Sequence, residues 1–249
     1  MRPGLTDVAR LMVPKELSRS LRPDEAEAER SAMALLAVLA HEVGRGDLDG
    51  MHVLDIGCGV KFTQAVINHD LRIGSYTGID VSTQVIDFLR SSVNDPRFAF
   101  HHVDFHNPRY NSTGVKMTPT AILPVERRDF DVICGFSLVT HLAPEDTESI
   151  LAITGRYAHE QTRLVFTAFL DVHTESGHGL VDRYSRALGG DVSTGAPYRD
   201  FVAGDALRAA LYSEPYLREL IGSSPWELVS IRDPTPHAQH LLTLRRRPR

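Results

Sequence analysis

Patterns typical of helices alternate along the chain with short apolar runs of strand length. Helical patterns cover 23–44, 60–69 and 144–159, and Ser82 has the character of a helix N-cap. The strand-length runs between these patterns are 51–56, 76–79, 98–103, 131–136 and 163–169. Strands that alternate with helices form a parallel sheet with right-handed crossovers. This part of the chain therefore predicts an α/β fold.

The alternation changes after the fifth predicted strand. Residues 171–200 are rich in Gly, Ser, Asp and Thr, which predicts a long loop with one or two helical turns. A helix interrupted by Pro215 is predicted over 205–222. The last two strands are predicted at 226–231 and 240–244. Because the interval between them is too short for a crossover helix, we expect an antiparallel hairpin at the sheet edge.

The predicted fold class is therefore α/β and doubly wound. We expect a mostly parallel, seven-stranded Rossmann-like sheet with an antiparallel edge hairpin and a helical cap. Residues 1–46 are predicted to form an N-terminal helical cap segment, and residues 47–249 the Rossmann-like domain. A cap insertion within that domain is expected at about 171–225.

Composition and charge narrow the classes of partner. Hydrophobic residues make up 42% and charged residues 24% of the 249 residues, as in soluble globular proteins. The net charge is −5 and the Lys and Arg residues are scattered, so no nucleic-acid partner is expected. No apolar run is long enough to span a membrane, and no membrane partner is expected. Cys58 and Cys134 are too few for a disulfide framework, which favours a cytoplasmic protein. A homodimer is left open.

The most informative motif is VLDIGCG at 53–59. Asp55 ends the first predicted strand, and Gly57 and Gly59 follow it. Glycines there let a ligand approach the backbone at the carboxyl edge of the sheet. The dinucleotide pattern G-x-G-x-x-G is not met, since its last position is Phe62. An aspartate before the glycines would repel a pyrophosphate but suits a ligand with an ammonium and a sulfonium.

Acidic residues also follow the next two predicted strands. Asp80 comes close to the ~20 residues after the glycines at which an acidic residue accepts the ribose hydroxyls. Asp104 and Phe105 follow the third strand, and the fourth lies within FDVICGFSLVTHL at 130–142.

These four motifs, spread over 53–142, resemble those of the class I S-adenosylmethionine-dependent methyltransferases, whose first motif is D-x-G-x-G-x-G. Lys61 stands where that motif has its third glycine. The resemblance implies S-adenosyl-L-methionine as methyl donor and S-adenosyl-L-homocysteine as product. The donor-binding residues that it implies are Asp55, Gly57, Cys58, Gly59, Asp80, Val81, Asp104, Phe105, Gly135 and Phe136.

Individual roles follow from the same resemblance. Carbonyls near Gly135 and Phe136 would receive the methionine ammonium, and Val81 would pack on the adenine. Asp104 would accept from the adenine amine, next to the backbone amide of Phe105.

Sequence motifs that are absent exclude several classes of methyl acceptor. There is no Asn/Asp-Pro-Pro-Tyr/Phe pattern, no Pro-Cys pair for cytosine chemistry and no paired-glutamate loop. What remains resembles enzymes that methylate small hydroxylated or carboxylated metabolites, so we expect transfer to an oxygen atom of a small-molecule acceptor. The alternatives are a non-catalytic S-adenosylmethionine-binding regulatory protein, which Lys61 leaves open, a methyltransferase acting on RNA or protein, and a nicotinamide-dependent oxidoreductase.

A hydroxyl acceptor benefits from a general base, and histidine is the commonest one. His141 is expected to start the helix after the fourth strand and to face the methyl group. His173 and His178 follow the fifth strand and are further candidates, with Asp182 four residues after His178. The acidic residues and histidines near 171–182 match no metal-site spacing, and no metal is expected.

Overall fold

The computed structural model describes residues 10–18, 25–108, 110–171, 196–203, 207–232 and 239–248. Its helices are α1 (Glu25–Glu42), α2 (Lys61–Asn68), α3 (Thr83–Ser92), α4 (Pro144–Thr154) and α6 (Glu214–Gly222), with a 3-10 turn η1 (Val139–His141). Its strands are β1 (Leu48–Ile56), β2 (Ile73–Asp80), β3 (Phe98–His102), β4 (Phe130–Gly135), β5 (Ala158–Leu170), β6 (Tyr198–Ala203), β7 (Leu207–Tyr212), β8 (Trp226–Arg232) and β9 (His240–Arg246).

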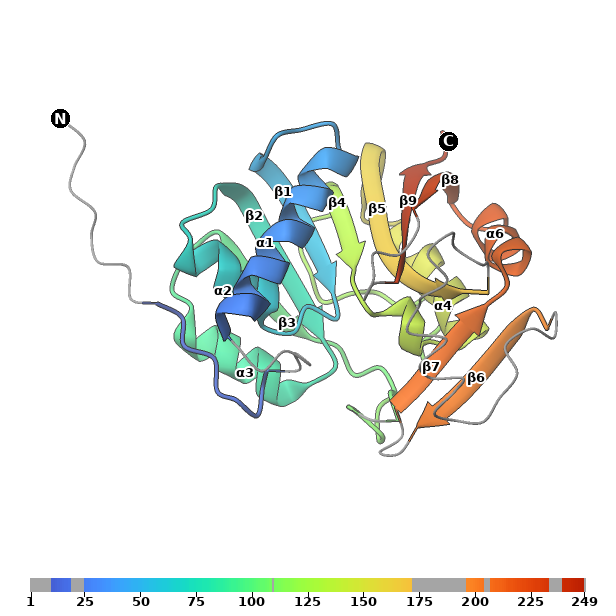
Figure 1. Cartoon of the computed structure of the whole chain (residues 1–249), viewed down its shortest axis with the longest axis horizontal. Coiled ribbons are helices and arrows are strands. Elements are labelled where there is room, and N and C mark those ends of the chain that lie inside the picture. Colours follow the sequence, from blue (N-terminus) through green and yellow to red (C-terminus); the bar gives the residue numbers. More distant parts are fainter. Residues whose placement is uncertain are drawn as a thin grey trace.

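The main sheet has the order β3-β2-β1-β4-β5-β9-β8. The first five strands in this order are parallel, and β9 runs antiparallel to both β5 and β8. Counted by themselves in chain order, the seven strands read 3-2-1-4-5-7-6. The predicted doubly wound sheet and its antiparallel edge hairpin are thus confirmed. The arrowheads of β1, β2 and β4 point the same way in Figure 1, toward the carboxyl edge of the sheet.

Helices cover the two faces of this sheet. In Figure 1, α1, α2 and α3 lie in front of it, while α4 lies behind. Successive side chains of β1 alternate between the two layers: Val53 belongs to the core beneath α1 and α2, and Leu54 and Ile56 to the core around α4 and α6. This alternation places Asp55 on the face that α1 and α2 cover. The α3 helix begins as predicted, since the Ser82 hydroxyl accepts from the Val85 amide.

The helix predicted over 205–222 is wrong in its first half. Residues 207–212 form β7, which pairs antiparallel with β6 and, through Leu211 and Tyr212, parallel with the end of β5. Pairing with β6 and with the distant end of β5 overrides the helix propensity of this Ala- and Leu-rich stretch. Pro215 lies in the first turn of α6 rather than breaking a helix, because a missing N–H costs nothing there. In its described part the predicted helical cap is thus a β-hairpin followed by one helix.

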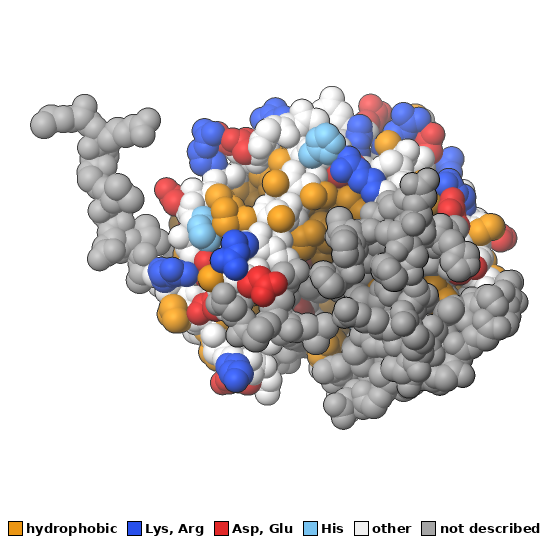
Figure 2. Space-filling view, viewed as in Figure 1, with side chains coloured by type: hydrophobic (Ala, Val, Ile, Leu, Met, Phe, Trp, Pro, Cys, Tyr) orange, Lys and Arg blue, Asp and Glu red, His pale blue; other side chains and the backbone are white. Residues whose placement is uncertain are grey.

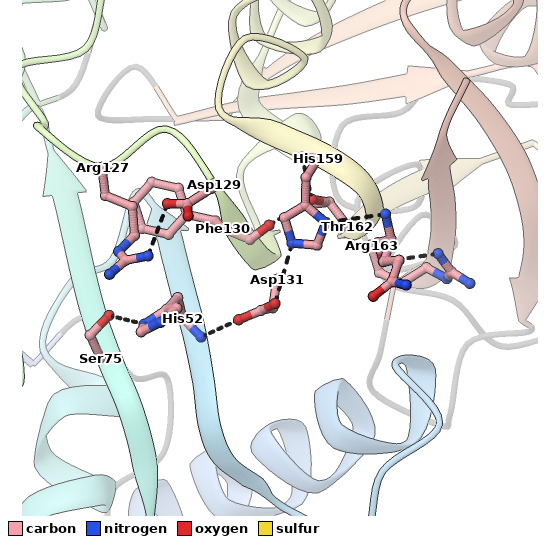
Figure 3. A network of polar contacts seen from close by, with 10 residues as sticks. His52, Ser75, Arg127, Asp129, Phe130, Asp131, His159, Thr162 and Arg163 are labelled. Atoms are coloured by element: carbon pink, nitrogen blue, oxygen red, sulfur yellow. Dashed lines mark hydrogen bonds and ion pairs between the residues drawn. The ribbon is translucent and has the colours of Figure 1, made fainter. Parts of the chain in front are cut away.

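The helix predicted over 144–159 is too long. It ends at Thr154, where Gly155 packs so closely on Pro225 that an added Cβ would lie 2.8 Å from it. His159 belongs instead to the start of β5, and its Nε2 lies 3.2 Å from Asp131 Oδ1 at the amino edge of the sheet. Figure 3 shows this pair beside His52.

Candidate functional site

The loop after β1 is folded tightly onto the end of β2. Gly57 and Gly59 have positive φ angles of 72° and 50°, which glycine adopts without strain. The amides of Gly57 and Cys58 both donate to the Ile79 carbonyl, at 2.8 and 3.0 Å. The Gly59 amide donates to Asp80 Oδ2 at 3.0 Å. The two-glycine motif therefore forms a loop at the carboxyl edge that β2 holds in place.

Asp80 is the residue that joins this loop to the start of α3. Its side chain is 1% exposed, Oδ2 accepts from Gly59, and Oδ1 accepts from the Ser82 amide at 2.8 Å. The structure adds an organising role that the sequence did not indicate.

The Cys58 side chain packs between the glycine loop and β2. A Cβ added at Gly78 would lie 2.8 Å from Cys58 Sγ and 3.1 Å from Phe100. A glycine is therefore required at position 78 for the loop to lie this close to β2.

Asp55 lies in β1, two residues before Gly57, and is 3% exposed. The Tyr76 hydroxyl donates to its Oδ2 at 2.5 Å, and the Cys134 thiol also donates to it. Burial raises the pKa of Asp55 to about 6, and the charge of Asp80 adds to the increase, whereas the two hydrogen bonds oppose it. The structure thus places a buried carboxyl group directly under the glycine loop.

The segment after β3 folds back on itself. Phe105 bridges to Val115, whose amide donates to the Asp104 carbonyl at 2.8 Å. The exposed Asp104 carboxylate accepts from Asn111 at 2.9 Å. Phe105 and Val81 both pack against the core around α4. These contacts bring Val81, Asp104 and Phe105 to the same edge as the glycine loop.

The turn after β4 lies beside the start of α2. The Phe136 ring meets the Phe62 ring edge-on at a centroid distance of 5.4 Å. Ser137 has a φ of 55°, and its amide donates to Thr167 Oγ1 of β5 at 2.7 Å. This bond holds the turn that includes Gly135 and Phe136 next to the glycine loop.

His141 is the last residue of η1 and does not start a helix. Its amide donates to the Leu138 carbonyl, and α4 begins only at Pro144. The expected helix start at His141 is wrong because a separate 3-10 turn intervenes. That turn packs on β7, whose Tyr212 hydroxyl donates to the Leu142 carbonyl at 2.7 Å. His173 and His178 lie outside the described residues.

Lys61, the departure from the glycine pattern, points away from the loop. Its Nζ donates to Ser31 Oγ of α1 at 3.0 Å. The lysine side chain therefore connects α2 to α1. Among the described residues, no atom outside Gly59 and its two chain neighbours lies within 4 Å of where a Cβ on Gly59 would project.

Sequence reasoning missed two supporting residues, Tyr76 and Thr167. Both are buried polar residues within apolar strands, and this is the one signal the sequence carried for them. It also missed an open cavity of about 410 Å³, lined by His106, Gly114, Lys116, Met117, Glu145 and Asp146.

No group of three or more His, Cys, Asp or Glu side chains in the described part of the chain could hold a metal ion. None of the described helices is long and apolar enough to cross a membrane.

Comparison with known proteins agrees with this geometry. Residues 54–166 match the family model of a methyltransferase domain. Similar solved structures include magnesium protoporphyrin IX methyltransferase (ChlM) from Synechocystis with bound SAH, with a TM-score of 0.54, 11% identity, and coverage of 93% of this chain and 92% of that one. Another is 1,6-didemethyltoxoflavin-N1-methyltransferase from Burkholderia thailandensis, with a TM-score of 0.54, 17% identity and coverage of 89% and 79%. A third is a putative methyltransferase complexed with the activator Trm112 from Haloferax volcanii, with a TM-score of 0.53, 15% identity and coverage of 90% and 96%.

At sequence identities of 11–17%, the similarity to these solved structures shows the fold alone. The motifs at the carboxyl edge and the match to the methyltransferase domain identify the chemistry. Residues 54–166 therefore form a methyltransferase domain, and the protein is an S-adenosylmethionine-dependent methyltransferase.

Proposed function

We propose that this enzyme transfers the methyl group to an oxygen atom of a small hydroxylated or carboxylated molecule. The observation that carries the proposal is the cavity of about 410 Å³, which is within the size range of small-molecule sites. It opens between the segment that follows β3 and the first turn of α4. Both follow carboxyl ends of strands, on the side of the sheet where the glycine loop lies.

The walls of the cavity carry charges of both signs. His106 and Lys116 come from the segment after β3, while Glu145 and Asp146 come from α4. Such walls suit a polar acceptor better than an apolar one, because each charged group can orient a hydroxyl or carboxylate of the acceptor.

Methyl transfer is an in-line displacement at the sulfonium carbon, and holding both reactants in line supplies much of the rate. In this proposal Asp80 and Asp104 contact the ribose and the adenine, and carbonyls near Gly135 receive the ammonium. A carboxylate acceptor needs no base. For a hydroxyl acceptor we propose His141, which lies between the turn after β4 and α4, as the group that takes the proton. His173 and His178 stay predictions.

Surface charge favours a small acceptor over a nucleic acid. On the face in Figure 2, basic and acidic side chains are interspersed across the described surface. A surface of mixed sign attracts a polyanion weakly.

The proposed cytoplasmic location is supported by Cys58 and Cys134, which are buried thiols rather than a disulfide.

The test is a screen of hydroxylated and carboxylated metabolites that measures S-adenosylhomocysteine formation. With an acceptor in hand, Lys116→Ala and Glu145→Gln are expected to raise its KM several-fold and to leave the Kd for S-adenosylhomocysteine unchanged. Glu148→Gln is the matched control, because Glu148 lies on the same helix but does not line the cavity. Turnover with RNA or protein and with none of the metabolites would contradict the proposal, as would donor binding without any turnover.

A further inference from the structure

A buried polar chain crosses three strands beneath the glycine loop. It runs from the Tyr76 hydroxyl of β2 to the Asp55 carboxylate of β1 and on to the Cys134 thiol of β4. Tyr76 and Cys134 are 0% exposed. The strand register explains why these three side chains meet. Asp55 pairs with Gly78 on one side and Cys134 on the other, and Tyr76 lies two residues before Gly78 on the same face of the sheet.

The polar chain carries a negative charge on Asp55 that its neighbours among the described residues leave uncompensated. The groups that act on Asp55 are Tyr76 and Asp80 of β2 and Cys134 of β4, with Cys58 close to Tyr76. These groups are neutral or negative. Burying a carboxylate beside a second carboxylate is costly unless a positive charge comes near.

The position of this charge relates it to the donor. Asp55 comes two residues before Gly57, and Cys134 immediately before Gly135, so the carboxylate lies under the two segments that form the donor site. S-Adenosylmethionine carries an ammonium and a sulfonium. Methyl transfer breaks a carbon–sulfur bond of the sulfonium, the sulfur keeps the electron pair, and the product is a neutral thioether. The product therefore has one positive charge less than the donor.

We propose that Tyr76 is a positioning residue that holds Asp55 as a buried countercharge, so that the site favours the sulfonium donor over the thioether product. Because the buried surroundings have a low dielectric constant, this charge interacts more strongly with a cation at a given distance. The preference would help the product leave after each turnover. The proposal rests on the donor site and is independent of the identity of the acceptor.

The countercharge acts only when Asp55 is ionised. Because burial raises the pKa of Asp55 to about 6, the preference for the donor is expected to grow as the pH rises through that value. The Tyr76 hydroxyl donates to the ionised carboxylate and lowers its pKa. Without that hydroxyl, Asp55 would ionise at a higher pH.

The experiment is calorimetric titration of wild-type protein and Tyr76→Phe with S-adenosylmethionine and with S-adenosylhomocysteine, from pH 5 to pH 8. We expect the ratio of the two affinities to rise with pH in the wild type, with its midpoint near pH 6. In Tyr76→Phe the midpoint moves up by about one unit, the scale of one hydrogen bond to a charged group. At pH 7 the ratio falls several-fold. Both molecules carry the ammonium, so the ratio isolates the sulfonium.

Two further variants and a control make the result specific. Cys134→Ala removes the other donor to Asp55 and is expected to move the midpoint in the same direction. Asp55→Asn is expected to abolish the pH dependence of the ratio. The control is Tyr157→Phe, since Tyr157 is equally buried and its hydroxyl bonds to the backbone of Leu123.

The proposal is overturned if Tyr76→Phe and Cys134→Ala both keep the wild-type ratio and midpoint, or if Asp55→Asn keeps the pH dependence. Failure of the wild-type protein to bind either molecule would instead overturn the donor site itself.

Discussion

The carboxyl and amino edges of the sheet both carry aspartates, yet they use them differently. At the carboxyl edge Asp55 and Asp80 are 3% and 1% exposed. At the amino edge the Asp131 side chain is 27% exposed; it accepts from the His52 amide at 2.7 Å and pairs with His159. The His52 ring lies 2.8 Å from the Ser75 hydroxyl (Figure 3).

The difference lies in what the aspartates hold. Asp131 joins β1 to the beginnings of β4 and β5, and its partners come from the strands themselves. Asp80 accepts from the Gly59 amide of the glycine loop and from the Ser82 amide at the start of α3, and Asp55 lies beneath that loop. In a parallel sheet only the carboxyl ends of the strands lead into loops that can surround a ligand. The direction of the strand, rather than the type of residue, separates the site from a structural contact.

The largest predicted difference between the two edges is in how the free energy of unfolding depends on pH. The pKa of Asp55 is about 6 in the folded protein, against 3.8 for a free aspartate side chain. Folding therefore favours protonated Asp55, a stabilisation that is present below about pH 4 and lost as the pH rises through 6. The difference corresponds to about 3 kcal/mol.

Asp55→Asn does not titrate, so its free energy of unfolding relative to wild type should rise by about 3 kcal/mol between pH 4 and pH 7. Urea unfolding at several pH values measures this. Parallel curves for Asp55→Asn and wild type would contradict the prediction.

The next effect concerns donor binding. Asp80→Ala removes the acceptor of both the Gly59 and Ser82 amides and is expected to weaken S-adenosylhomocysteine binding by at least about 2 kcal/mol, or about 30-fold. Isothermal titration measures the Kd. Asp131→Ala should bind S-adenosylhomocysteine as wild type does, even if it is less stable. Equal losses in the two variants would mean that the edges do not differ as described.

The smallest effect concerns the packing of the loop. Gly78→Ala would place a methyl group 2.8 Å from Cys58 Sγ and is expected to lower the free energy of unfolding by about 1–2 kcal/mol. Chemical denaturation measures the loss. Adding Cys58→Ala removes the sulfur and should restore part of the stability. A double variant as unstable as the sum of the single ones would show that the strain lies elsewhere.

Much of the fold could be predicted because its signals are local. The glycine loop after β1, the Ser82 cap and the short interval between β8 and β9 each depend on residues close together in the sequence. The strand at 207–212 could not be predicted, because its partners are β6 and the distant end of β5. His159 likewise follows an apparent helix in sequence but belongs to β5, because Gly155 packs on Pro225.

The sequence by itself determined the class of fold, the position of the glycine loop and the three acidic residues at or just after the ends of the first three strands. Spacing and residue type carry this information, because strand alternation and turn geometry are local properties. Only the tertiary structure decided which groups surround each acid. Asp80 acquires two backbone amides, Asp104 an asparagine, and Asp55 a tyrosine and a thiol from its neighbouring strands. The physical reason is that strand register and burial select the partners of a carboxylate and thereby its charge.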